Sequence, residues 1–329
     1  MTAPDEALPP MPIPPPRTGT LQLPPGLNVG EAFARILGHH GALMLRHAAR
    51  IPPDADDPEP VHQTRVALRR LRSAIAVFRA ATSTPAIVTL GQDLRTLGHL
   101  LAPAREWDVF LAETGHRIAE VFPDDTTIQT LLRAAARKRD RTYATLLRDR
   151  AGPHFAALTT HLTNIIDRSG WRGGLLPEQR ELLTMRLDEY GAGVLGRMHR
   201  RVRRGGKRIM HLDPPALHAL RLRGKQLRYA AEFFTEQFEI KPARRYIARL
   251  ADLQAQLGLL NDAVTSAALM AELRARGHAA GVVMGYTAAQ AEAARLHLAE
   301  VWKQFRKAEP FWPDPAIVTA EETGASVAT

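Results

Sequence analysis

The sequence predicts an all-α fold built from two related four-helix units. After a proline-dense start, apolar residues recur three and four positions apart in long stretches rich in Ala, Leu, Arg and Glu. No segment shows the alternating pattern of a β-strand. A shift of 156 residues also superposes two parts of the chain without a gap, which indicates an internal repeat. Two four-helix bundles follow from these observations.

The helices are predicted in two sets, with Pro and Gly marking the breaks. The first set covers about 30–50, 60–82, 86–120 with an interruption near Pro103, and 125–149. The second set covers about 178–205, 214–239, 242–276 with an interruption near Gly258, and 282–308. The Gly-containing stretch SGWRGG lies between the two sets and is expected to join them.

These limits define one folded domain with two terminal extensions. The domain is expected to span 29–312, with repeat one at about 29–150 and repeat two at about 178–310. Residues 1–28 are predicted to be a disordered, Pro-rich leader, because proline removes backbone donors and blocks helix formation. Residues 313–329 are predicted to be a disordered tail.

The repeat keeps basic and apolar positions in one register for about 40 residues. The basic matches are His62 with His218, Arg65 with Arg221, Arg69 with Lys225, and Arg72 with Arg228. The apolar matches are Leu71 with Leu227, Phe78 with Phe234, and Leu94, Leu97 and Leu101 with Leu250, Leu253 and Leu257. Chance rarely preserves both classes together, so we interpret the pattern as a duplication.

Charge suggests a polyanionic partner, although a basic surface is often merely solvated. The chain has 44 Lys and Arg against 34 Asp and Glu, and its 13 histidines add charge on mild acidification. Cysteine is absent, which excludes disulfides, thiolate metal sites and a cysteine nucleophile. No apolar run is long enough to span a membrane, and the proline-rich start does not resemble a signal peptide. We therefore expect a cytoplasmic protein.

Two helices are predicted to carry matching cationic rows. His62, Arg65, Arg69 and Arg72 are spaced by three, four and three residues, which places them on one side of a helix. His218, Arg221, Lys225 and Arg228 repeat this row in the second half. Like charges one turn apart repel by about 0.2–0.5 kcal/mol per pair, and no acidic residue lies between Glu59 and Asp93. A bound anion would offset that repulsion.

Further residues, all basic except Tyr229, are candidates for the same surface. One group lies in RMHRRVRRGGKR and includes Arg197, Arg201, Arg204 and Lys207, which would make one side of a cleft more basic. The others are Arg70 beside the first row, Arg137 and Arg141 on the fourth helix, and Tyr229 at the end of the second row. Arginine suits phosphate because its planar guanidinium donates two parallel hydrogen bonds and keeps its charge. The paired histidines would strengthen such binding as pH falls.

The rows HxxRxxxRRLR and HxxRxxxKxLRY, with the following segments LLAPAREWDV and LGLLNDAV, resemble the CHAD family of conserved-histidine α-helical domains. The resemblance covers about 29–312. It implies two four-helix bundles about a pseudo-two-fold axis, with a basic central groove that binds inorganic polyphosphate, often at polyphosphate granules. It also implies that the ligand-facing residues are His62, Arg65, Arg69, Arg72, His218, Arg221, Lys225 and Arg228.

The sequence departs from the family pattern at its first trailing segment. Arg105, Glu106, Trp107 and Asp108 stand where the family more usually has Arg-Asp-x-Asp. Many relatives also carry a triphosphate-processing CYTH domain before CHAD, but no alternating Glu-x-Glu-x-Lys pattern occurs here. We therefore expect a stand-alone CHAD domain without that catalytic function.

Three other functions compete with polyphosphate binding. A phosphate-processing enzyme would need carboxylates to hold Mg²⁺, for which Glu106, Asp108 and Asp262 are the suggestive residues. A metal protein would need His ligands at turn spacing, which the two row histidines lack. A nucleic-acid-binding protein would need exposed aromatic platforms, and only Tyr229 is placed to be one. We expect no catalytic residue, metal or cofactor, no specific nucleic acid and no membrane partner.

Overall fold

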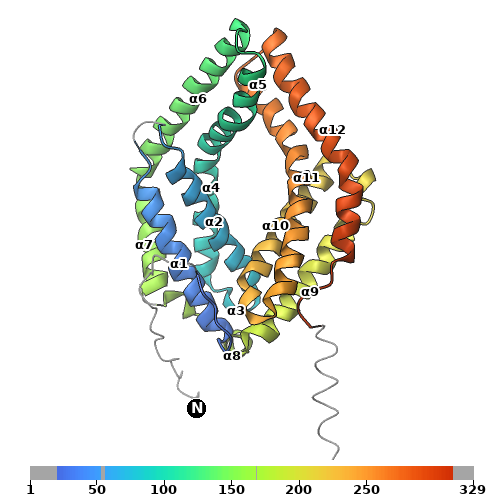
Figure 1. Cartoon of the computed structure of the whole chain (residues 1–329). Helices are drawn as coiled ribbons and strands as arrows, with labels where there is room; N and C mark the ends of the chain where they lie inside the picture. Colours follow the sequence, from blue (N-terminus) through green and yellow to red (C-terminus); the bar gives the residue numbers. More distant parts are fainter. Residues whose placement is uncertain (1–20, 53–55, 168, 314–329) are drawn as a thin grey trace, which may run out of the picture.

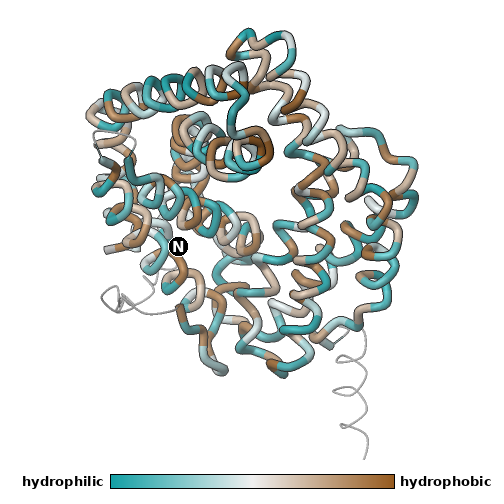
Figure 2. Tube along the Cα trace, turned by 45° about the horizontal axis from the view of Figure 1, so that its top comes forward, coloured by the Kyte–Doolittle hydropathy of each residue, from teal (hydrophilic) through white to brown (hydrophobic). Residues whose placement is uncertain are grey.

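The computed structural model describes residues 21–52, 56–167 and 169–313, and these form an all-α fold (Figure 1). Within those ranges the only β-type pairing is an isolated bridge between Asn28 and Arg186. Each helix mixes hydrophobic and hydrophilic positions along its length (Figure 2). None of the described helices has the length and apolar character needed to cross a bilayer.

The first half of the chain forms one side of the molecule in Figure 1. Its elements are α1 (Val29–Ala49), α2 (Glu59–Val77), α3 (Arg79–Thr82), α4 (Pro85–Val109), the π-helical turn η1 (Phe110–Gly115), α5 (His116–Val121), α6 (Thr126–Arg150) and α7 (Pro153–Asp167). Side-chain caps set several of the boundaries. Asn28 and Glu31 form a reciprocal capping box on α1, and Thr84 accepts a hydrogen bond from the Ile87 amide at the start of α4.

The elements of the second half are η2 (Gly170–Arg172), α8 (Pro177–Thr184), α9 (Leu187–Gly205), η3 (Ile209–His211), α10 (Pro214–Phe233), η4 (Thr235–Gln237), α11 (Ile240–Glu272) and α12 (Gly277–Lys307). Of these, η2 and α8 pack against helices of the first half, and the elements from α9 onward form the opposite side (Figure 1). Asp213 begins α10 by accepting a hydrogen bond from the Ala216 amide at 2.8 Å. Proline is tolerated in the first turn of α10 because a backbone N–H at that position would find no acceptor within the helix.

The main hydrophobic core joins the two halves at one end of the molecule. It contains Phe33 and Phe78 from the first half and Leu195 and Phe234 from the second, all fully buried. Phe78 and Phe234 are related by the shift of 156, and their ring centroids lie 5.9 Å apart. A pseudo-two-fold axis that related the two halves would produce such a contact between matched residues if both lay close to it.

A second hydrophobic cluster joins the halves at the opposite end, where α5, α6 and α12 meet in Figure 1. Trp107 and Ile128 from the first half pack there with Leu269 and Val283 from the second. Two ion pairs accompany it: Lys138 to Glu272 at 2.7 Å and His278 to Asp125 at 2.9 Å. The helices therefore close into a ring that is held at both ends.

Both predicted helix interruptions are wrong: the first lies elsewhere in the chain, and the second is absent from α11. α4 passes through Pro103 because Leu101 and Ala104 are buried in the main core while Pro103 itself is exposed. The irregularity comes later, at η1. α11 continues through Gly258, since a single glycine costs only about 1 kcal/mol in a helix and buried residues on either side, such as Leu257 and Leu269, hold the helix in place.

Three other boundaries differ from the predictions. Residues 1–20 of the predicted leader lie outside the described residues, but Leu23 and Leu27 are buried in the main core, so the leader was predicted to extend too far. The helix expected at 178–205 is two helices, α8 and α9. α7 was not predicted, and it covers the main core with Leu158 and Leu162. Of the predicted tail, only Pro313 is described.

Candidate functional site

A cavity of about 930 Å³ lies between the two halves of the chain. Segments of α2, α4, η1, α5, α10, α11 and α12 line it. Its charged and histidine side chains are His62, Arg65, Arg69, Arg105, Glu106, Glu113, His116, Arg117, His218, Arg221, Lys225 and Asp262. Six arginine and lysine side chains thus face three carboxylates, so basic groups outnumber acidic ones in the lining.

The first three residues of each predicted cationic row meet in this cavity, while the fourth residues, Arg72 and Arg228, do not line it. His62, Arg65 and Arg69 reach it from α2, while His218, Arg221 and Lys225 reach it from α10. Each helix buries its apolar stripe on another face, with Leu68 and Leu71 in α2 and Leu220 and Leu227 in α10. Because residues three and four apart share one side of a helix, this packing fixes the direction of both rows.

Arg69 occupies a central position among these charges. Its positive charge lowers the pKa of Arg65 on its own helix and of Arg221 and Lys225 on α10. None of these four side chains forms an ion pair with a carboxylate in the described part of the chain. Arg65 does donate one hydrogen bond to the Gly98 carbonyl oxygen, at 3.2 Å. The cations therefore repel one another across the space that separates the two halves.

Burial adds to this repulsion. Loss of solvent is the largest cause that lowers the pKa of Arg65 and Arg221. The same cause, followed by the charges of Arg221, Arg69 and Arg228, lowers the pKa of Lys225 to about 8. Desolvation and the charge of Arg105 also lower the pKa of His62. A ligand with negative charge would reverse these shifts.

Positions related by the 156-residue shift have similar surroundings in the cavity. Glu106 partly offsets the charge of Arg65, and Asp262 does the same for Arg221. The next matched pair differs: Arg105 lies near His62, whereas Asn261 bonds the Nδ1 atom of His218 through its side-chain oxygen at 2.9 Å. At this matched pair the first half contributes the cation Arg105, whereas the second half contributes the neutral Asn261.

The carboxylates of the cavity are themselves partly desolvated. Burial is the largest cause that raises the pKa of Glu106 and Asp262. For Asp262 the charge of Arg221 opposes this rise, and the nearby carboxylate of Glu113 adds to it. Two carboxylates from different halves thus approach each other at one side of the cavity. In the described residues no three His, Cys, Asp or Glu side chains are grouped so that they could hold a metal ion.

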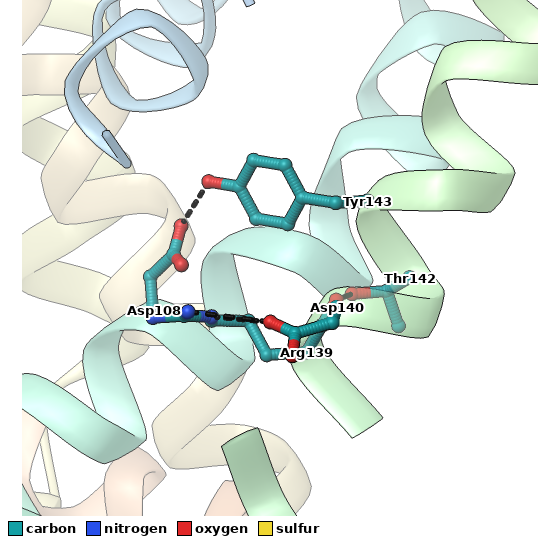
Figure 3. A network of polar contacts seen from close by, with 5 residues as sticks. All are labelled: Asp108, Arg139, Asp140, Thr142 and Tyr143. Atoms are coloured by element: carbon teal, nitrogen blue, oxygen red, sulfur yellow. Dashed lines mark hydrogen bonds and ion pairs between the residues drawn. The ribbon is translucent and has the colours of Figure 1, made fainter. Parts of the chain in front are cut away.

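Asp108, suggested by the sequence as a carboxylate for metal or ligand, lies outside the cavity. It is 4% exposed and accepts a hydrogen bond from the Tyr143 hydroxyl at 2.9 Å (Figure 3). Figure 3 shows it turned toward α6, where Arg139 pairs with Asp140 at 3.2 Å. Burial raises the pKa of Asp108, and the hydrogen bond from Tyr143 opposes that rise. Its visible contacts link α4 to α6.

Three other sequence candidates lie where α2 and α10 contact each other. Arg70 and Arg228 both pair with Glu232, the latter at 3.4 Å. Their guanidinium groups lie over the ring of Tyr229, at 4.8 and 5.6 Å from its centroid. Tyr229 is only 8% exposed, and its ring makes cation–π contacts with these two guanidinium groups. This cluster does not line the cavity.

The remaining candidates are exposed and do not line the cavity. Arg72 is exposed on α2, close to Gly98, and Arg95 is the charge that most lowers its pKa after burial. Arg137 and Arg141 are exposed on α6. The group Arg197, Arg201, Arg204 and Lys207 is exposed on and just after α9, away from the cavity lining. α9 turns its buried face toward α10, which leaves this group pointing outward.

Several cavity residues were not predicted as binding residues. Arg105 lies in a segment where the sequence directs attention to acidic residues, and Arg117 follows an irregular turn whose position was not foreseen. Arg117 is also paired with Glu120, at 3.3 Å. Asn261 and Gln290 carry no charge and give no sequence signal. The repeat matches Asn261 with Arg105, but Arg105 was not predicted as a binding residue either.

Comparison with known proteins agrees with this architecture. The CHAD domain from the plant Ricinus communis is 27% identical in sequence, with a TM-score of 0.75, over 90% of this chain and 98% of that chain. PptA from Streptomyces chartreusis is 17% identical, with a TM-score of 0.64, over 84% of this chain and 99% of that chain, which shows a shared fold. A search of curated proteins finds no match.

The CHAD domain family matches the sequence over residues 35–271, which is more than half of the chain. That range begins within α1 and ends near the C-terminus of α11. It includes both histidine rows and both trailing segments. On this match, and on its all-α fold, the chain belongs to the CHAD family.

Proposed function

We propose that this protein binds inorganic polyphosphate in the cavity between its two halves, without catalysing a reaction on it. One observation carries the proposal. Arg65, Arg69, Arg221 and Lys225 line a single cavity from two helices, and no carboxylate forms an ion pair with them in the described residues. Polyphosphate binding is also what membership of the CHAD family implies.

The chemistry of a phosphate chain fits this arrangement. Each arginine can donate paired hydrogen bonds to phosphoryl oxygens, and such charge-assisted bonds contribute about 1.5–3 kcal/mol each. Cations on both walls would hold consecutive phosphate groups of one chain from opposite sides. The neutral donors Asn261 and Gln290 add hydrogen bonds without further repulsion. Binding would replace the repulsion around Arg69 with attraction.

The proposal contains no hydrolytic step. Phosphoryl transfer needs carboxylates that hold Mg²⁺ against the reacting phosphate. Glu106 and Asp262 lie near Arg65 and Arg221, respectively, and we assign them the role of limiting the cationic charge of the empty cavity. Release of orthophosphate from polyphosphate by the pure protein with Mg²⁺ or Mn²⁺ would refute this part of the proposal. We further propose that the protein associates with polyphosphate granules.

Nucleic acid is the competing polyanion, and the aromatic residues argue against it. Single strands bind by stacking bases on exposed rings. Tyr229 is covered by Arg70 and Arg228, and Phe110 in the cavity wall is 3% exposed. Tyr286 is the one partly exposed aromatic ring in the described lining, and its hydroxyl accepts a hydrogen bond from Gln290. One such ring is a small stacking surface beside the charges and hydrogen-bond donors of the cavity. We expect phosphate chains to compete effectively against DNA of equal charge.

A titration tests the proposed function. Purified protein is titrated by calorimetry against polyphosphates of defined length, with heparin and single-stranded DNA as polyanion controls, at physiological salt. We expect polyphosphate to bind more tightly than either control and to displace labelled DNA. Equal affinities for all three polymers would mean that the cavity binds polyanions without specificity for polyphosphate. The absence of polyphosphate binding would refute the proposal.

A further inference from the structure

Lysine is rare in this chain, and one lysine lies inside the cavity. The sequence has six lysines among its 44 basic residues, the other 38 being arginines. Lys225 stands in the cavity at the position that the repeat matches with Arg69. The other five lie outside the cavity lining. An amine differs from a guanidinium in one chemical respect that matters here: it can lose its proton and become a nucleophile.

We propose that Lys225 is a site of covalent acylation by acyl phosphates, which the neighbouring arginines Arg69 and Arg221 bind through the phosphoryl group. The modification uses the same cations as the proposed function but does not require that polyphosphate be the ligand. An acyl phosphate bound in this way would bring its carbonyl carbon close to the Nζ atom of Lys225. The arginines that bind the phosphoryl group and the amine that attacks the carbonyl carbon would then lie in one cavity.

The surroundings of Lys225 support a reactive amine. Arg221 and Arg228 flank it on α10, Arg69 faces it from α2, and Asp262 faces it from α11. Burial and the three arginines lower its pKa to about 8, while Asp262 opposes them weakly. At pH 7.5 such a group is about one-quarter neutral, whereas an ordinary lysine is about 0.1% neutral. Lys225 also forms no ion pair that would hold its proton, within the ranges described.

The reaction balances without a further reagent. The lone pair of the neutral Nζ atom attacks the carbonyl carbon, and a carbon–nitrogen bond forms. The bond between that carbon and the bridging oxygen breaks, and orthophosphate leaves with the bonding electrons. The surplus proton on nitrogen passes to the departing phosphate or to water. The product is an amide at Lys225, which has no charge and no longer attracts an anion.

The test uses the whole chain with acetyl phosphate, and mass spectrometry of peptides measures the acetylation rate at each lysine. Lys241 serves as the internal control because it is exposed at the start of α11. We expect Lys225 to react at least about tenfold faster than Lys241 at pH 7.5, since far more of it is neutral. Its rate should level off above pH 8, while the rate of Lys241 continues to rise. Equal rates at the two lysines would overturn the proposal.

Two controls separate anion binding from simple reactivity. Arg221→Gln should slow acetylation of Lys225 by acetyl phosphate several-fold more than acetylation by the N-hydroxysuccinimide ester of acetic acid, which carries no phosphoryl group. An equal effect on both reagents would overturn the binding role of the arginines. Acetyl phosphate should also react with saturation at Lys225 and linearly at Lys241. These readouts do not involve polyphosphate, so they stand or fall separately from the proposed function.

Discussion

Replacing Arg69 by glutamine should weaken ligand binding and stabilise the empty protein at the same time. Arg69 lies among Arg65, Arg221 and Lys225, and its charge disfavours the charged form of each. Glutamine keeps a hydrogen-bonding side chain of moderate length but removes the charge. The two effects have opposite signs because the positive charge of Arg69 repels its neighbours in the empty cavity and attracts an anionic ligand when one binds.

The magnitudes follow from the number of charges involved. Loss of one charge-assisted hydrogen bond of about 1.5–3 kcal/mol raises Kd roughly 10- to 150-fold. Removal of three repulsive neighbours at about 0.2–0.5 kcal/mol each gives about 1 kcal/mol of stability at low salt. For a chain of this size that gain raises Tm by about 1–2 °C.

Calorimetric titration with polyphosphate and differential scanning calorimetry of the ligand-free protein measure the two effects. Arg137→Gln is the matched control, because Arg137 is exposed on α6 and lies outside the cavity. It should change neither quantity beyond experimental scatter. A lower Tm for Arg69→Gln would refute the reasoning, since it would mean that the protein itself stabilises this charge. An unchanged Kd would remove Arg69 from the binding site.

Three further outcomes can be measured. Polyphosphate affinity should fall as pH rises from 7 to 9, because Lys225 loses its proton near its pKa of about 8 and the ligand favours the protonated form; titrations of Lys225→Arg should show a flatter profile. Burial lowers the pKa of His40 to about 3, so on acidification the histidine takes up a proton in the unfolded state before it does so in the folded state. Tm should therefore fall as pH drops below 6.5, and the free energy of unfolding should decrease by about 3 kcal/mol near pH 4. His40→Gln should reduce this decrease. Gly206→Ala should destabilise by about 1–3 kcal/mol in denaturant unfolding, since its Cβ would lie 2.3 Å from the buried ring of Trp302, whereas Gly258→Ala, with open space around it, should stabilise by up to about 1 kcal/mol.

The sequence predicts the helical class and the first three cavity residues of each row, for identifiable reasons. Long amphipathic stretches determine helices through a local pattern, so α1, α2, α6 and α10 begin within a few residues of the predicted positions. Spacing along one helix also determines which residues share a face, which is why Arg65 and Arg69 were predicted together. Both kinds of inference depend only on neighbours in the sequence.

Features that depend on contacts between distant segments could not be predicted in the same way. Arg70 and Arg69 are adjacent cations in the sequence, yet only the packing of α2 against α10 gives Arg70 the partner Glu232, 162 positions later. The exposed group around Arg201 has a clear sequence signal for charge but none for the direction in which α9 faces. Pro103 is a strong local breaker, and buried neighbours on one face of α4 override it.

The shared core around Phe78 and Phe234 has a consequence for how the molecule comes apart. Because each half contributes side chains to the same interior, neither half has a complete interior of its own. Both should lose structure in one cooperative transition, and an isolated half should not fold. In the folded protein the walls of the cavity are therefore already ordered before a ligand binds. Binding should then require little free energy to order the protein.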